Sequence, residues 1–167
     1  MQKKILYLFL ITIILSSCKM NYSFSGINIS KGIKTFQINY ITNNAMIVEP
    51  GLNDEIRNEL IDRITKRTNL TEAKTDGDLV YEAEITEYSI VPVSMTANQT
   101  ASQSRLTIAV KLNYTNTKKE DDNFNKTYKW HYDFAANQNL NSIKDEAHKE
   151  IYDKIINDIF NETLAKW

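Results

Sequence analysis

The residue with the most distinctive chemistry in the chain is its only cysteine, Cys18. The thiol follows Leu15, Ser16 and Ser17, so a branched side chain and two small ones precede it. This spacing is typical of a lipobox, in which a diacylglyceryl group alkylates the thiol and a peptidase cuts just before the modified cysteine. A single cysteine also excludes an intramolecular disulfide framework and a cysteine-rich metal site. We therefore predict a lipid anchor at Cys18; the alternative is an incidental thiol in an ordinary cleavable signal.

The residues before Cys18 support this prediction. Lys3 and Lys4 precede an apolar run from Ile5 to Leu15 that only Thr12 interrupts, the pattern of a secretory signal. The run is about half of the ~20 apolar residues that a membrane-spanning helix needs. We predict a lipoprotein signal peptide at residues 1–17 and a lipidated tether at residues 18–32.

The residues after Cys18 indicate where the anchor is sorted. Lys19 stands where an inner-membrane retention signal would place Asp, and no acidic cluster follows the cysteine. These features favour sorting to the outer membrane, with the protein facing the periplasm.

Composition indicates one ordinary domain at residues 33–167. Hydrophobic residues make up 42% of the chain and charged residues 25%, which is enough to build a core and a solvated surface. The formal charge of −1 becomes −3 when Lys3 and Lys4 leave with the signal peptide. A nearly neutral domain binds nucleic acid poorly, so we expect no nucleic-acid partner.

Two periodicities divide this domain into elements. Apolar side chains recur at every second residue in four segments, which we predict to be strands: 33–40, 78–91, 105–115 and 124–134. They recur every three or four residues in two segments, which we predict to be helices: 52–68, and 142 to the end of the chain with Ser142 as N-cap. The connection 92–104 is longer than a tight hairpin needs.

Local details refine these elements. The inward face of the first strand should hold Phe36, Ile38 and Tyr40. The inward parity of the second strand changes near Thr86-Glu87, which predicts a β-bulge. Asp76-Gly77 should form a turn, with a small hairpin to residues 70–73 as one option.

The order of elements predicts the fold class. A strand, a helix, three strands and a helix favour an α+β fold: a two-layer sandwich of a mostly antiparallel four-stranded sheet with two helices on one face. The other sheet face should be polar, and either solvated or covered by a partner.

Residue types that could do further chemistry favour structural roles. Enzyme motifs are missing, and neither His131 nor His148 has a second His or Cys at ligand spacing, so we expect no catalytic residue, cofactor or metal. Glu82 and Glu84 share a strand face and could form an acid/base pair, but a solvated face is the favoured interpretation. The aromatic residues Tyr128, Trp130 and Tyr132 could stack on a sugar or base, but their parity favours the sheet core.

An ordered set of features resembles the LPS-assembly lipoprotein family LptE, over residues 18–167. The set comprises the lipobox, Tyr22-Ser23-Phe24-Ser25-Gly26, Phe36-x-Ile38, the helix 52–68, Gly77-Asp78-Leu79 leading to Glu84-Ile85-Thr86-x-Tyr88, Val91-Pro92-Val93, Arg105-Leu106-Thr107-Ile108 and the terminal helix. Many relatives place the Tyr-x-Phe step directly after Cys-Gly, whereas here Lys19-Met20-Asn21 intervene, which bears on tether length.

The resemblance implies a non-catalytic outer-membrane lipoprotein. Such a protein plugs the LptD β-barrel, supports the folding of that barrel, and assists lipopolysaccharide transport and insertion into the outer leaflet. The family's lipopolysaccharide binding is attributed to basic residues, for which Arg105 and Lys111 are the candidates here; ordinary surface charge is the alternative. A different periplasm-facing lipoprotein adaptor, such as a cell-wall synthase activator, is the alternative function, and a lipid-anchored hydrolase would lack a nucleophile with its base.

The lipid anchor gives the first testable prediction. Mass spectrometry of the mature amino terminus should find Cys18 as the first residue, carrying the mass of its acyl chains. Cys18→Ser should abolish both the cleavage and the added mass, because serine has no thiol to alkylate. A wild-type protein cleaved elsewhere, or with an unmodified Cys18, would refute the anchor.

Overall fold

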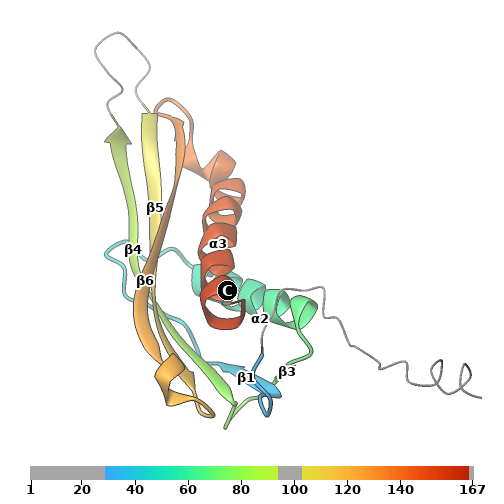
Figure 1. Cartoon of the computed structure of the whole chain (residues 1–167). Helices are drawn as coiled ribbons and strands as arrows, with labels where there is room; N and C mark the ends of the chain where they lie inside the picture. The colour runs from blue at the N-terminus through green and yellow to red at the C-terminus, as the bar shows by residue number, and fades with distance from the viewer. Residues whose placement is uncertain (1–28, 94–102, 166–167) are drawn as a thin grey trace, which may run out of the picture.

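The computed structural model describes residues 29–93 and 103–165. The predicted signal peptide, most of the tether and the centre of the 92–104 connection lie outside these residues. Figure 1 shows a long twisted sheet with two helices packed on it. Along the chain the elements are β1 (Thr35–Ile38), β2 (Thr42–Asn43), α2 (Leu52–Arg67), β3 (Thr71–Glu72), β4 (Leu79–Val93), β5 (Gln103–Asn116), a 3-10 helix (Glu120–Asp122), β6 (Phe124–Ala135) and α3 (Leu140–Leu164).

The sheet has the order β3-β1-β4-β5-β6, and β2 pairs with β4 off this path. The antiparallel pairs β4–β5 and β5–β6 form the predicted meander. The α+β class with two helices is confirmed, and the long strand pairs are antiparallel as predicted. The sheet has six strands rather than four and is mixed rather than purely antiparallel, because the short strands β1, β2 and β3 pair in parallel. The reason is the connection: α2 carries the chain back across the sheet between β1 and β4, so both strands run the same way.

The optional small hairpin before β4 does not form. Residues 71–72 pair with β1 instead, which lies between β3 and β4. The turn before β4 does exist, and Asp76 adopts a left-handed backbone with φ of 56° in it. β3, before this turn, and β4, after it, therefore pair with opposite edges of β1.

The bulge in β4 is confirmed. The register of β4 against β5 shifts between Ile85 and Glu87. The extra residue restores the inward direction of Tyr88, which is buried together with Ile85. The bulge therefore keeps the apolar side chains of β4 under the helices from Leu79 to Tyr88, beyond which Ile90 is exposed.

Two inward predictions are wrong. Tyr40 is 70% exposed, because β1 ends at Ile38 and the neighbouring Ile41 takes the buried position as the chain crosses to β2. Trp130 is 38% exposed, because β6 is the edge strand of the sheet and the helical layer only partly covers it. The ammonium of Lys154, from α3, lies 5.9 Å from the centre of the Trp130 ring.

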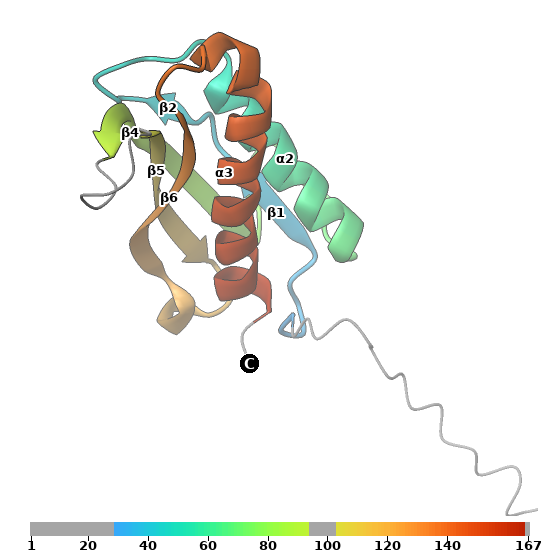
Figure 2. The same ribbon diagram turned by 90° about the horizontal axis from the view of Figure 1, so that it is seen from above.

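Both helices cover the same face of the sheet, as Figure 2 shows. The predicted stripe of α2 is buried: Leu52, Ile56, Leu60 and Ile64. So is the predicted stripe of α3: Ile143, Ala147, Ile151, Ile155, Ile156, Ile159 and Phe160. Arg63 joins the two helices, since its guanidinium donates to Asp153 of α3 at 2.9 Å and also to Asn157.

The N-cap of α3 differs from the prediction. The helix begins at Leu140, and Asn139 caps it by accepting a hydrogen bond from the backbone N–H of Asn141 at 2.9 Å. Ser142 lies inside the first turn, where its hydroxyl donates to the backbone carbonyl of Asn139 at 2.6 Å. Asn and Ser are both strong N-caps, so composition alone did not separate them.

Asp78 ties together three segments at one end of the sheet. Its carboxylate accepts hydrogen bonds from the backbone N–H groups of Lys34 and Thr35, at 2.8 and 3.0 Å, and from the Thr35 hydroxyl at 3.1 Å. The ammonium of Lys118, which follows β5, lies 3.1 Å away. The adjacent Gly77 is packed so closely on β1 that a Cβ there would lie 2.7 Å from the Cβ of Gln37. The start of β4 is thus pinned to β1 and to the end of β5.

We predict that Asp78→Ala lowers the free energy of unfolding by about 2–3 kcal/mol, because charge-assisted hydrogen bonds are lost together. Chemical denaturation at neutral pH measures this change, and Asp121→Ala in the exposed 3-10 helix should stay within about 0.5 kcal/mol of wild type. The N–H of Lys34 is the main cause that lowers the pKa of Asp78 below its ordinary 3.8. The unfolded chain therefore binds a proton first, and the difference between wild type and D78A should shrink as pH falls below 3.8. A constant difference would contradict this role.

Candidate interaction surface

The face of the sheet opposite the helices is polar. Side chains of β4, β5 and β6 that point away from the helices stand side by side in registered rows: Glu82 with Asn113 and Asn125, Glu84 with Lys111 and Thr127, Glu87 with Ala109 and Lys129, Ser89 with Thr107 and His131, and Val91 with Arg105 and Asp133. We call this set the polar sheet face.

Ion pairs cross the strands on this face. The ammonium of Lys129 lies 2.7 Å from the carboxylate of Glu87, and Ala109 stands between them in the register. The bridge explains why Ala109 is buried although it points away from the helices. Glu87 also accepts from the Ser89 hydroxyl at 2.9 Å, and the Lys129 hydrogen bond is the main cause that lowers its pKa. Much of the charge on this face is thus paired within the domain.

Arg105 lies on the polar sheet face, and its guanidinium is engaged by Asp133. Nε and Nη2 of Arg105 donate to the two carboxylate oxygens of Asp133 at 2.6 and 2.7 Å. This fork holds the pKa of Asp133 below its usual range and raises that of Arg105. An anionic ligand at Arg105 would have to compete with a bidentate carboxylate already in place.

Lys111 lies on the same face but in a different environment. It lines a hollow of about 380 Å³ together with Glu82, Glu84 and Asn113. Within the described residues no carboxylate lies within ion-pair distance of its ammonium. Lys111 lies six positions after Arg105 on β5, which is about 20 Å along a strand. The structure therefore does not bring the two candidates together around one small ligand.

Glu82 and Glu84 accept hydrogen bonds from asparagine side chains and thereby stabilise the sheet. Glu82 accepts from Asn39 at 3.1 Å and from Asn113 at 2.8 Å, and Glu84 accepts from Asn44 at 2.7 Å. Asn39 and Asn44 flank β2, so both carboxylates fasten this segment to β4. The geometry favours the structural interpretation over an acid/base pair.

The aromatic candidates divide between core and surface. Tyr128 is buried, and its hydroxyl donates to Glu162 of α3 at 2.8 Å. Burial is the main cause that raises its pKa far above the usual value. Trp130 is half exposed and its ring stacks against His131, with the ring centres 5.9 Å apart.

Sequence patterns did not reveal an exposed apolar loop. Met46, Ile47 and Val48, between β2 and α2, are 99%, 50% and 60% exposed. No periodicity marks them, because they belong to neither a strand nor a helix. Their signal was composition alone: three successive apolar side chains in a segment without regular structure.

Sequence patterns also missed the burial of His148. Its side chain on α3 is almost fully buried, and Nε2 lies 3.1 Å from the hydroxyl of Tyr88. Nδ1 lies 3.8 Å from the carboxylate of Glu55. Burial is the main cause that lowers the pKa of His148, and burial likewise raises the pKa of Tyr88 to about 12. His148 is three residues before Ile151 and seven before Ile155, so helical spacing was the available signal.

Within residues 29–93 and 103–165, the chain holds no group of three or more His, Cys, Asp or Glu side chains arranged to bind a metal ion. None of the helices in this part of the chain is both long and apolar enough to cross a bilayer.

The fold and surface define a small α+β domain with helices on one face of a mixed sheet and an open polar face on the other. The model of the lipopolysaccharide-assembly family LptE matches residues 33–163. The chain belongs to this family. No curated protein sequence matches it.

Solved structures share the fold at low sequence identity. A minor lipoprotein from Acinetobacter baumannii matches with a TM-score of 0.51 and 11% identity, over 77% of this chain and 91% of that one. A protein from Xanthomonas campestris matches with a TM-score of 0.50 and 9% identity, over 79% and 84%. The rare lipoprotein B from Shewanella oneidensis has 14% identity over 75% and 89%, with a TM-score of 0.40. At 11% and 9% identity, the first two likenesses concern the fold alone.

The buried histidine predicts a pH effect on stability. The folded pKa of His148 lies below the ordinary 6.5, so the unfolded chain binds a proton first as pH falls through 6.5. The free energy of unfolding should therefore decrease with falling pH in this range. His148→Gln keeps a polar partner for Tyr88 but does not titrate, so the decrease should be smaller in that variant.

Denaturant unfolding of both proteins between pH 7.5 and 5.5 measures this difference. The charged groups near His148 are Glu49, Glu55, Lys144 and Asp145. All four are present in both wild type and H148Q. His131→Gln, on the opposite sheet face, is the control and should follow wild type. Parallel curves for wild type and H148Q would contradict the prediction.

Proposed function

We propose that this protein is a lipid-anchored, periplasm-facing accessory protein of the outer membrane that plugs an LptD-type β-barrel, supports its folding and assists lipopolysaccharide transport to the outer leaflet. The observation that carries the proposal is the family match over residues 33–163. Lipopolysaccharide assembly is the role of that family, and the barrel, the anchor and the location are our finer proposals.

The polar sheet face supports a position inside a barrel. The interior of a large outer-membrane barrel is polar and wet, so a protein that fills it needs polar side chains on its exposed surface. The rows on β4, β5 and β6 supply amides, carboxylates and ammonium groups, many of them paired within the domain. Paired charges lose less hydration on enclosure than isolated ones would.

The exposed loop Met46–Val48 supports a protein partner. Three apolar side chains in succession, led by a 99% exposed Met46, form a small anchor of the kind that an interface buries at its centre. The loop follows β2, which Glu84 fastens to β4 through Asn44. A fixed base for the loop lowers the entropy cost of binding.

The anchor at Cys18 supplies local concentration. A protein held at the membrane meets a membrane-embedded partner at a far higher effective concentration than a free one. For lipopolysaccharide contact we propose Arg105 and Lys111, as the family's use of basic residues suggests. Lys111 is the better placed of the two, since Asp133 occupies the guanidinium of Arg105. We propose no catalytic residue, cofactor or metal.

Affinity purification tests the proposed function. The tagged, lipidated chain, extracted in mild detergent, should recover a large outer-membrane β-barrel. Recovery of a cell-wall synthase instead would support the alternative adaptor role and refute ours. Depletion of the protein should lower the amount of folded barrel, which is measured by its heat-modifiable migration on a gel.

Charge reversal at Lys111 sharpens the test. Lys111→Glu adds a carboxylate beside Glu82 and Glu84, so barrel recovery and lipopolysaccharide binding should each fall by about tenfold, the equivalent of about 1.4 kcal/mol. Lys149→Glu makes the same change in charge on the exposed side of α3 and should retain wild-type behaviour. Unchanged binding in K111E would remove Lys111 from the proposed surface.

A further inference from the structure

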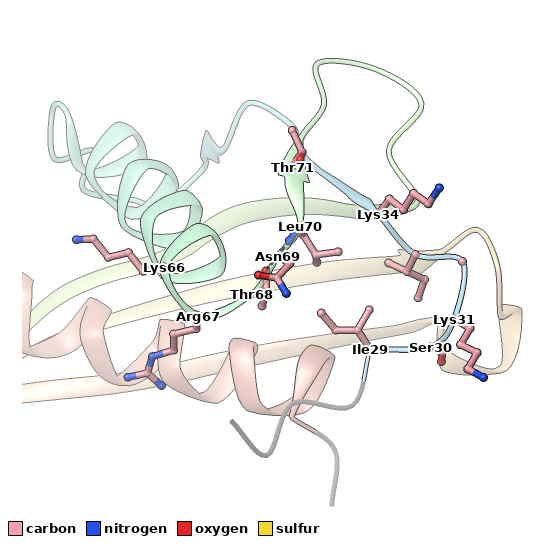
Figure 3. Close-up of a pocket in the computed structure, with 12 residues that line it drawn as sticks. Ile29, Ser30, Lys31, Lys34, Lys66, Arg67, Thr68, Asn69, Leu70 and Thr71 are labelled. Atoms are coloured by element: carbon pink, nitrogen blue, oxygen red, sulfur yellow. Dashed lines mark hydrogen bonds between the residues drawn. The ribbon is translucent and has the colours of Figure 1, made fainter. Parts of the chain in front are cut away.

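A second hollow lies where the described part of the chain begins. It has a volume of about 840 Å³ and is formed by two segments, residues 29–34 before β1 and residues 66–71 after α2. Figure 3 shows the two segments facing each other across it. This hollow is separate from the polar sheet face, and none of the residues discussed above for barrel or lipopolysaccharide contact lines it.

The lining of this hollow carries charge of one sign. Its twelve residues include four cations and no carboxylate; the cations are Lys31, Lys34, Lys66 and Arg67. We call these four residues the basic rim. The domain as a whole is slightly acidic, with a formal charge of −3 without residues 1–17. The basic rim is therefore a local reversal of the protein's charge.

Two of the four cations in the basic rim have neither an ion pair nor an aromatic contact within the described residues. Lys66 pairs with Asp62 at 2.8 Å, and the guanidinium carbon of Arg67 lies 5.5 Å from the centre of the Phe160 ring. Within residues 29–93 and 103–165, neither Lys31 nor Lys34 has a carboxylate within ion-pair distance of its ammonium. Both are exposed to solvent.

The directions of the side chains indicate the shape of the partner. In Figure 3, Lys66 and Arg67 extend to one side of the hollow, while Lys31 and Lys34 extend to the other. The four cations do not converge on one point, so the geometry does not suit one small anion held in a cage. It suits a partner that presents several negative charges over an extended surface.

The middle of the hollow is apolar. Ile29 and Leu70 extend into the space between the two segments in Figure 3. Ile29 and Ile33 are partly buried against the core, and Leu70 is buried. A ring of cations around aliphatic side chains matches the water–lipid boundary, where headgroup phosphates surround acyl chains.

The chain path places a membrane near this hollow. Ten residues separate Cys18 from Ile29, so the chain between them spans at most about 40 Å when fully extended. If Cys18 carries acyl chains, this end of the domain stays within that distance of the lipid surface. This step rests on the proposed anchor at Cys18, and not on the barrel partner.

We propose that the basic rim docks on the anionic phospholipid headgroups of the leaflet that holds the Cys18 anchor. The domain then sits with the 29–34 and 66–71 segments against the membrane, and the sheet extends away from it. Basic residues near an anionic surface each add attraction that decays within a Debye length, so the rim acts only at this short range.

Vesicle flotation tests the proposal without the anchor. The mature chain from residue 18, carrying Cys18→Ser, is mixed with vesicles of phosphatidylethanolamine alone or with added phosphatidylglycerol. It should float with the phosphatidylglycerol vesicles at low salt and not with the neutral ones. Lys31→Glu with Lys34→Glu should lower the partition coefficient at least tenfold. Lys31→Gln with Lys34→Gln, which removes charge without adding acids, should give a smaller loss in the same direction.

A matched control separates the rim from bulk charge. Lys149→Glu with Lys154→Glu changes the net charge by the same amount on the exposed side of α3 and should bind like the parent. Far-ultraviolet circular dichroism and the melting temperature verify that each variant is folded. Equal losses in both double variants, or no flotation of the parent with phosphatidylglycerol, would overturn the proposal. Purification of the barrel reports on the proposed function separately, so either idea can fail alone.

Discussion

The carboxylate of Asp78 is the contact on which the arrangement of the sheet depends. β1 has only four residues and would pair weakly on its own, yet it is the central neighbour of both β3 and β4. Two backbone N–H groups before and at the start of β1 donate to Asp78, and Thr117 after β5 donates its N–H to the Asp78 carbonyl at 2.9 Å. Gly77 packs directly on Gln37, where a Cβ would come within 2.7 Å, so the start of β4 lies close against β1.

The two faces of the sheet have different surroundings. The crossover through α2 and the return of α3 place both helices over one face, where the apolar side chains gather. The other face is left with polar side chains that must satisfy one another or water. They do so through Lys129–Glu87, Arg105–Asp133 and the amides on Glu82. Such a face can be enclosed by a polar partner with little rearrangement.

Periodicity predicted the elements well and their partners poorly. The α2 stripe, the β4 bulge and the inward apolar side chains of β5 follow from side-chain spacing within one segment, and the structure confirms them. β2 and β3 have two residues each, too few to show a period of two. Parallel pairing of β1 was missed because side-chain alternation is the same in parallel and antiparallel strands. The exposure of Trp130 depends on β6 being the edge of the sheet, which no local pattern encodes.

The sequence by itself determined most of the residues that turn inward, the place where the long strand bulges and the single thiol at Cys18, because these depend on the chain alone. The tertiary structure decided what lies next to what. Arg105 meets Asp133 across 28 residues, and His148 meets Tyr88 across 60. Lys31 and Lys66 line one hollow only because β1 and the end of α2 are brought together. These contacts require the register and the crossover to exist first, so a charge or an imidazole has no defined partner until the sheet is assembled.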